Sequence, residues 1–161
     1  MSSIAPSRSA FPLGVLVALS LICSPAGQSC EAAVAEPGQE LCRSLWEGYL
    51  EGVKASQPGR IAIAKDAVFM YPDMQALRGR DAIQAHLVSV GSGLKMLEVG
   101  FKIERCDVVG TRAYTFVTVD ELIQEGATPP ARRHTRCAAV WEQQLDKSWQ
   151  VAHLLVNYRK P

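Results

Sequence analysis

The stretch 132–158 constrains the fold more than any other part of this 161-residue chain. Its alternation of apolar and polar residues predicts two long strands, at 132–144 and 148–159, joined by a polar turn. The same alternation predicts two more strands upstream, at 95–109 and 111–124. Because consecutive strands with short connections pair antiparallel, the C-terminal half is predicted to be a curved four-stranded meander.

The residues before this meander have helical periodicity. Residues 41–55 carry apolar side chains at every fourth position, which predicts an amphipathic helix. Gly48 and Gly52 within it are expected to let another element approach the backbone. Further elements are expected as a short helix at 60–64, a short buried strand at 67–71 and a helix at 82–90. The chain is therefore predicted to be α+β, with about four long strands plus a short one and two to three N-terminal helices on the concave face of the sheet.

The N-terminus is predicted to be an export signal. The apolar run 11–23 has the length of a signal-peptide core and is too short to span a bilayer comfortably. Cleavage is expected after Ala26, or after Ala35, and an uncleaved anchor or an organellar presequence are the alternatives. These boundaries assign 1–26 to a signal peptide, 27–40 to a linker and 41–159 to the folded domain. The mature protein is expected to be secreted or periplasmic, without membrane attachment.

Charge and cysteine content narrow the classes of function. The chain has 17 basic and 16 acidic residues, spread along its length, which disfavours a nucleic-acid binder. Metal-ligand spacings and phosphate-binding loops are missing from the sequence, so we expect no metal and either cofactor-free chemistry or none. If Cys23 leaves with the leader, Cys30, Cys42, Cys106 and Cys137 could pair in three ways, although Cys106 and Cys137 are also typical of small apolar strand residues.

Three short motifs carry a resemblance to a known superfamily. They are KDAV at 65–68, GRDAI at 79–83, and VW at 140–141 followed by WQVAH at 149–153. In this order and spacing they resemble the nuclear transport factor two-like superfamily, most closely its SnoaL-like branch, over residues 41–158. The resemblance implies a cone-shaped fold that encloses a pocket. The superfamily includes ketosteroid isomerases, polyketide cyclases, dehydratases, kinase association domains and proteins that only bind, so fold alone selects no activity.

The candidate catalytic residues are Asp73, Tyr49, Tyr71 and His153. Tyr49 falls where ketosteroid isomerases have an oxyanion-binding tyrosine, but their base aspartate precedes a proline, whereas here Tyr71 precedes Pro72 and Asp73 follows it. We expect Asp73 as general base, Tyr49 or Tyr71 as oxyanion donor and His153 as an acid or base near neutral pH. A solvated turn residue is the alternative for Asp73, and core packing for the others.

The candidate ligand-binding residues are Trp46, Phe69, Arg136 and Trp141. Arg136 would bind a carboxylate or enolate if it points into the cone. Trp141 and Phe116 would instead fill the cone if the protein is an interaction module.

Several other polar residues are expected to face solvent. His86 is placed on a helix surface, Asp120 and Glu121 near an exposed strand end, and His134 in a basic strand end with three arginines, Arg132, Arg133 and Arg136. Apart from Arg136, for which both orientations are open, these residues are therefore not expected in the pocket.

The last strand predicts a protein partner as well as a ligand. Alternation places Trp149, Val151, His153, Leu155 and Asn157 on one face, and both faces of the strand are largely apolar. One face would cover the pocket, and the other would meet a second copy in a homodimer. The leading hypothesis is an exported protein that binds a small hydrophobic molecule, with isomerase, cyclase or dehydratase chemistry on a carbonyl-type substrate. A non-catalytic binding or association module is the alternative.

Overall fold

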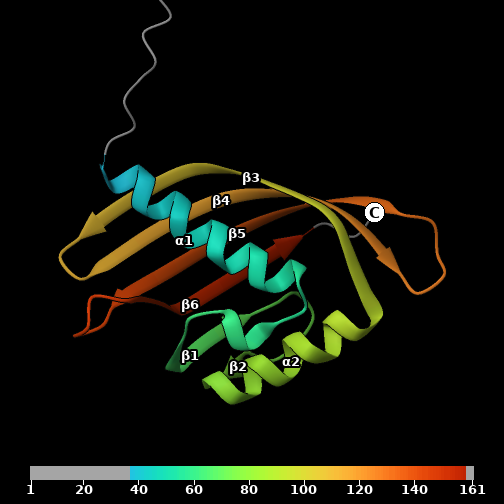
Figure 1. Cartoon of the computed structure of the whole chain (residues 1–161), viewed down its shortest axis with the longest axis horizontal. Coiled ribbons are helices and arrows are strands. Elements are labelled where there is room, and N and C mark those ends of the chain that lie inside the picture. Colours follow the sequence, from blue (N-terminus) through green and yellow to red (C-terminus); the bar gives the residue numbers. More distant parts are fainter. Residues whose placement is uncertain (1–36, 159–161) are drawn as a thin grey trace, which may run out of the picture. The chain divides into compact units, whose positions relative to one another are not determined.

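The computed structural model describes residues 37–158, so the predicted signal peptide lies outside the described residues. The α+β class is confirmed (Figure 1). In chain order the elements are α1 (Pro37–Lys54), η1 (Pro58–Arg60), β1 (Ile63–Met70), β2 (Leu77–Arg78), α2 (Arg80–Gly93), β3 (Leu94–Val109), β4 (Arg112–Glu125), β5 (Ala131–Gln143) and β6 (Trp149–Tyr158).

Two N-terminal boundaries differ from the prediction. Helix α1 begins at Pro37, inside the segment 27–40 predicted as linker. Proline is favourable in a first helical turn, and Glu40 there complements the helix dipole. The helix expected at 60–64 is a single 3₁₀ turn, Pro58–Arg60, because the chain already enters β1 at Ile63.

All six strands belong to one sheet in the order β2-β1-β6-β5-β4-β3. Strands β3 to β6 form the predicted antiparallel meander. Strand β1 joins it by pairing parallel to β6, with Ile63 opposite Val151 and Met70 opposite Leu155. The parallel pair brings the first strand beside the last one, which the local sequence pattern does not predict.

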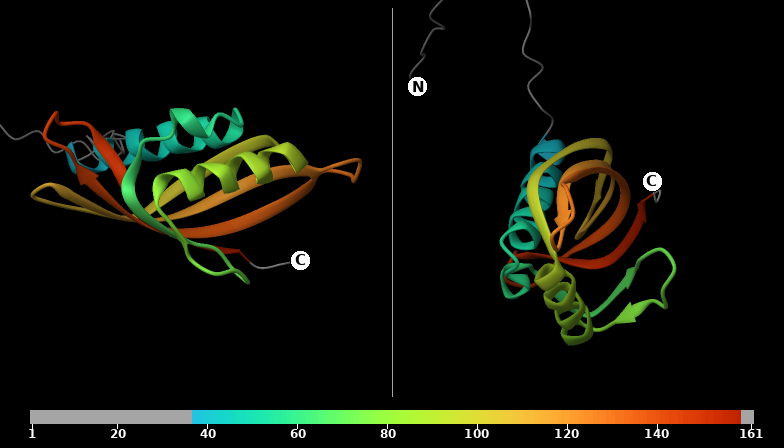
Figure 2. Two further views of the ribbon diagram at one scale, coloured as in Figure 1. Left: turned by 90° about the horizontal axis from the view of Figure 1, so that it is seen from below. Right: turned by 90° about the vertical axis from the view of Figure 1, so that its right-hand side faces the viewer.

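Both helices lie on the concave face of the sheet (Figure 2). Helix α1 buries Trp46, Tyr49 and Leu50 against this face. Its close approach to the chain is explained at Gly52, where an added Cβ would lie 2.5 Å from Ile61 Cγ1. The same expectation is wrong for Gly48, which has nothing within 4 Å of such a Cβ.

Three buried side chains connect α1, β4 and β5 at one end of the concave face. The Trp46 and Trp141 indole N–H groups donate to Thr115 Oγ1 over 3.0 and 3.2 Å, and the Thr115 hydroxyl donates to the Ala139 carbonyl over 3.4 Å. Thr115 itself is 1% exposed. Both indole donors and the hydroxyl are therefore satisfied inside the core.

A disulfide between Cys42 and Cys106 joins α1 to β3 beside this group. Cys106 pairs in register with Thr115 across the β3–β4 ladder. The interpretation of Cys106 as a plain apolar strand residue is therefore wrong, because it is covalently bonded to a helix that covers its strand. Cys137 fits that interpretation, since it is buried and carries a free thiol.

Strand β6 changes phase along its length. The β5–β6 register shifts between Val140 and Trp141, so that Val140 pairs with His153 but Trp141 pairs with Val151. Val151 is buried, whereas His153 and Leu155 are exposed. The prediction that these three share one face is wrong because the extra residue at the shift moves every later side chain to the opposite face.

Candidate ligand cavity

A cavity of about 210 Å³ lies between the two helices and the concave face of the sheet. Its walls are mostly aliphatic, with Leu50 and Val53 from α1, Leu87 from α2, and Leu154 and Val156 from β6. Small-molecule sites have this character, namely an apolar enclosure with a few polar groups that orient the ligand.

Two tyrosines form one polar part of the cavity lining. Tyr49 on α1 and Tyr71 after β1 both line it, and the Tyr71 hydroxyl is buried without a hydrogen-bond partner among the described residues. Burial raises the pKa of Tyr71 to about 12, and the neighbouring Tyr49 hydroxyl offsets part of this rise. Burial likewise raises the pKa of Tyr49, and Tyr71 adds to that effect. The two tyrosines are near enough to affect each other's pKa, although the Tyr71 hydroxyl has no hydrogen-bond partner of normal geometry among the described residues. Both hydroxyls stay protonated near neutral pH.

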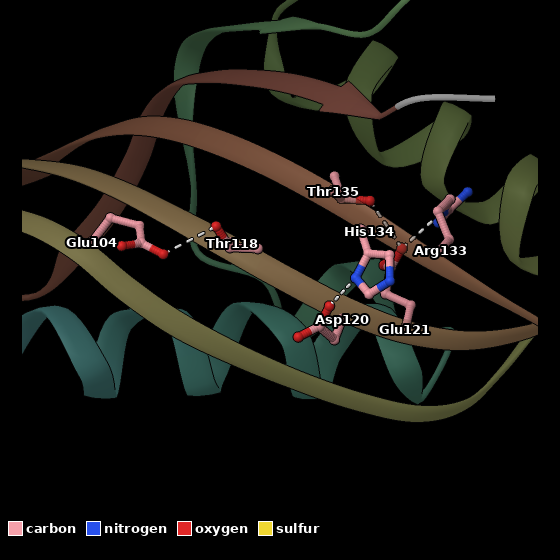
Figure 3. A network of polar contacts seen from close by, with 7 residues as sticks. All are labelled: Glu104, Thr118, Asp120, Glu121, Arg133, His134 and Thr135. Atoms are coloured by element: carbon pink, nitrogen blue, oxygen red, sulfur yellow. Dashed lines mark hydrogen bonds and ion pairs between the residues drawn. The ribbon is translucent and has the colours of Figure 1, made fainter. Parts of the chain in front are cut away.

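A buried ion pair forms the second polar part. Glu121 on β4 is 7% exposed, and its Oε2 accepts from Arg133 Nε over 2.6 Å and from Thr135 Oγ1 over 3.2 Å (Figure 3). The Arg133 guanidinium also lies over the Tyr158 ring, 5.1 Å from its centroid. All four side chains line the cavity. Strands β4, β5 and β6 thus place one paired acid and base on the same wall.

The residues next to this pair point the other way. Asp120 and His134 pair with each other on the exposed face of the sheet, directly beside Glu121 and Arg133 in the sequence (Figure 3). The prediction of a solvent-facing pair at Asp120 and Glu121 is therefore right for Asp120 and wrong for Glu121. Likewise Arg133 is partly buried, although Arg132 and His134 are exposed. Alternation across the strand explains both differences.

Two further lining residues carry titratable groups. Cys137 lies on β5 in the same row as Thr135, and burial, with a smaller contribution from Glu121, raises the pKa of its thiol to about 12. His86 is half-buried, with its ring centroid 5.0 Å from that of Tyr71. The prediction of His86 on the outer helix surface is therefore wrong, since α2 turns this side chain toward β1.

The structure gathers some of the predicted site residues and separates others. Tyr49, Tyr71 and Trp46 line the cavity. Phe69 and Trp141 are buried in the core beside it, at 0% and 3% exposure. Tyr49 makes ring contacts with both of them.

The remaining predicted residues do not line this cavity. Asp73 is exposed in the turn after β1, with a left-handed backbone at φ 61°. Arg136 and His153 are exposed on the opposite face of the sheet. Phe116, expected as a possible cone filler, is also on that face and is 51% exposed.

Five residues of the cavity lining are not predicted from the sequence: Glu121, Arg133, Thr135, His86 and Cys137. A signal existed for three of them, because Arg133, Thr135 and Cys137 occupy alternate positions of a strand that continues to the buried Trp141. Glu121 follows the same rule from Val117 and Val119 on β4. The described residues contain no group of three or more His, Cys, Asp or Glu side chains suited to a metal ion. In the same range no helix is long and apolar enough to cross a membrane.

Solved structures with the same architecture identify the fold. A ketosteroid isomerase-like protein from Erwinia carotovora atroseptica superposes with a TM-score of 0.69 at 15% identity, covering 78% of this chain and 99% of its own. A nuclear transport factor 2-like protein from Cytophaga hutchinsonii gives 0.65 at 11% identity, covering 77% and 100%. The chain has the nuclear transport factor 2-like fold.

Other comparisons show how little this fold specifies function. A putative Ca/calmodulin-dependent kinase II association domain from Exiguobacterium sibiricum also superposes on this fold, with a TM-score of 0.61 at 10% identity over 78% of this chain and 96% of its own. No protein-family model and no curated protein matches the sequence. At these identities the likeness extends to the fold alone.

Proposed function

We propose that this protein binds a small, neutral and mainly apolar molecule in the cavity. The observation that carries the proposal is the combination of aliphatic walls with a buried, unpartnered Tyr71 hydroxyl. Leaving such a hydroxyl unsatisfied costs about 1–3 kcal/mol, which a bound acceptor would recover. The ion pair of Glu121 and Arg133 contributes no net charge to the wall.

The cavity size limits the ligand. A buried apolar cavity of about 150 Å³ accepts benzene, and pockets for drug-sized ligands span roughly 300–1,000 Å³. At about 210 Å³ the cavity suits one substituted ring or a short branched chain. A four-ring steroid would need a larger cavity than this.

The acid–base part of the proposal concerns a SnoaL-like activity. A cofactor-free isomerase, cyclase or dehydratase acting on a hydrophobic carbonyl compound would use Tyr71 or Tyr49 to donate to the carbonyl oxygen. Asp73 is the proposed base, although it lies outside the cavity lining. If Asp73→Asn and Tyr49→Phe leave the turnover of every accepted substrate unchanged, these assignments are wrong, and a binding protein without catalysis is the better description.

Native mass spectrometry of protein purified from its own host tests the binding proposal. We expect a retained small molecule that is released on denaturation. Val156→Trp, which fills the cavity, should abolish the retained mass, whereas Val88→Trp should keep it, because Val88 is 55% exposed on α2 outside the cavity lining. Equal retention by both variants would place the ligand elsewhere.

We also propose that the helix-free face of the sheet binds a second copy of this chain. Met70, Leu155, Ala138 and Phe116 are register neighbours across four strands, and all but Ala138 are at least 41% exposed. Side chains of both charges flank this row on β3, which suits a self-complementary twofold contact. Light scattering should show a dimer that Phe116→Glu converts to a monomer. The control Leu145→Glu, in the fully exposed turn before β6, should leave it dimeric.

Export completes the proposal. The apolar segment 11–23 and the disulfide between Cys42 and Cys106 both fit an oxidising compartment. Mass spectrometry of secreted material should find a mature N-terminus near Gly27 or Glu36. Recovery of intact Met1 in the cytosol would contradict export.

A further inference from the structure

We propose that the ligand of the cavity carries an amide-like group, an N–H donor next to a carbonyl acceptor, and that Glu121 and Arg133 bind this group. The inference rests on the proposed function, because it names the chemical class of the molecule that the cavity holds. The supporting observation is that only some atoms of the ion pair take part in hydrogen bonds within the protein.

The charge of the pair selects a ligand without net charge. Glu121 and Arg133 neutralise each other at 2.6 Å, with side-chain exposures of 8% and 25%. A carboxylate ligand would compete with Glu121 for the guanidinium and leave one anion buried without a partner. A cationic ligand would compete with Arg133 in the same way. Removing one partner of a buried pair is strongly destabilising, so a neutral group binds at the lowest cost.

The atoms outside these bonds form a matched donor and acceptor. Both hydrogen bonds of Glu121 are accepted by Oε2, and Arg133 uses only its Nε in the bond to Glu121. Glu121 Oε1 can therefore accept a hydrogen bond, and the Arg133 Nη groups can donate one. An amide can satisfy both groups, since its carbonyl accepts from Nη–H and its N–H donates to Oε1. An ester can satisfy only the Nη donor, because it has no N–H.

The surrounding residues hold this pair in one orientation. The Arg133 guanidinium lies over the Tyr158 ring, and the Thr135 hydroxyl donates to Glu121 from the neighbouring position on the same face of β5. A fixed donor–acceptor edge loses little side-chain entropy on binding.

The Tyr71 hydroxyl supplies a second point of recognition. It lines the same cavity, has no hydrogen-bond partner among the described residues, and comes from the end of β1, on the other side of β6 from Arg133. The ligand therefore has an apolar ring-sized body, an amide that faces Glu121 and Arg133, and an oxygen acceptor that faces Tyr71.

Three matched probes test the inference by isothermal titration calorimetry near pH 7. They are 4-methoxybenzamide, with donor and acceptor, methyl 4-methoxybenzoate, with the acceptor alone, and the 4-methoxybenzoate anion. We expect the amide to bind about tenfold more tightly than the ester, the equivalent of about 1.4 kcal/mol, and the anion to bind most weakly.

Two single substitutions locate the effect. Arg133→Lys keeps the charge but removes the planar fork, so the preference for amide over ester should fall below about threefold while ester binding persists. Arg132→Lys, at the neighbouring exposed residue that pairs with Glu98, should leave the preference intact. Ester binding in each variant reports an intact cavity.

The outcomes separate the two proposals. If amide and ester bind equally well, or if the anion binds best, the amide inference is wrong while the binding cavity stands. Absence of binding by all three probes, together with no retained ligand in native mass spectrometry, would overturn the proposed function as well.

Discussion

The two ends of the concave face are built from similar residues but differ in how far the protein satisfies their polar groups. At one end, the core end, Trp46 and Trp141 donate to Thr115, and the Cys42–Cys106 disulfide closes the structure beside them. At the other, the cavity end, Thr135 and Arg133 hold one oxygen of Glu121. The Tyr71 hydroxyl there has no partner in the described protein.

Under the proposed function, this difference separates the residues that stabilise the fold from those that recognise the ligand. At the core end the polar groups of Trp46, Trp141 and Thr115 are satisfied within the protein, so a ligand could gain no hydrogen bond from them. At the cavity end the protein leaves a donor and parts of an ion pair for something else to satisfy. Substitutions at the core end should therefore reduce the free energy of unfolding, and substitutions at the cavity end should mainly change ligand affinity.

The largest expected effect is the loss of the disulfide. It closes a loop with a sequence separation of 64, for which chain-entropy arguments give a stabilisation of about 4 kcal/mol. Urea denaturation of the double variant Cys42→Ala/Cys106→Ala should show a loss of this size. Ligand affinity at the cavity end should change by less than about threefold, and a parallel loss of affinity would show that the two ends are coupled.

Thr115→Val should have the next largest effect. It removes the acceptor of both indole N–H groups, and each buried unsatisfied donor costs about 1–3 kcal/mol, so we expect a loss of about 3 kcal/mol in the free energy of unfolding. Thr135→Val is the matched control, since it removes one hydrogen bond while Arg133 still pairs with Glu121. If both substitutions cost the same, the contrast between the ends does not hold.

Alkaline pH should lower the free energy of unfolding through two buried groups of the cavity end. Burial raises the pKa of the Cys137 thiol from 9.0 to about 12 and that of Tyr71 from 10.0 to about 12. The folded state favours the neutral forms of both groups. Their contribution to the free energy of unfolding is therefore complete below pH 9 and is lost as the pH rises toward 12. For Cys137 the loss should reach about 2 kcal/mol by about pH 10.5. Cys137→Ala should flatten this part of the stability–pH curve, and an unchanged slope would exclude the thiol as its cause.

Tyr71→Phe should have the smallest effect on stability and the opposite sign. Because it removes a buried hydroxyl without a partner, the free energy of unfolding should rise by about 1 kcal/mol in the absence of ligand. Affinity for the methoxybenzamide probe should fall several-fold at the same time. Tyr114→Phe, on the helix-free face and 37% exposed, should change neither quantity.

The long elements could be predicted because their periodicity is strong. The pattern predicts strands at 132–144 and 148–159, and the structure has β5 at Ala131–Gln143 and β6 at Trp149–Tyr158. The parallel pairing of β1 with β6 could not be predicted in this way, because it depends on contacts between distant segments rather than on a local pattern.

The cavity was less predictable than the fold, for two physical reasons. Alternation assigns faces only while the register is continuous, and the shift at Val140 and Trp141 reverses the assignment for His153 and the residues after it. Burial of a charge also depends on a partner, and the Arg133 that compensates Glu121 lies on the neighbouring strand. The pattern of β4 alone, without its pairing to β5, therefore predicts that Glu121 faces solvent.

The parallel pair has a consequence for the order of folding. Strand β1 has two neighbours, the two-residue β2 and the C-terminal strand β6. Before β6 is synthesised, β1 can form only the short hairpin with β2, while β3, β4 and β5 can already pair with one another. The sheet can be completed only after β6 has been synthesised. Pairing Ile63 with Val151 is a slow step, because the two residues are far apart in the sequence. A nascent chain that lacks the ten residues of β6 would keep the edges of β1 and β5 open, and those edges are where a chaperone would bind or aggregation would begin.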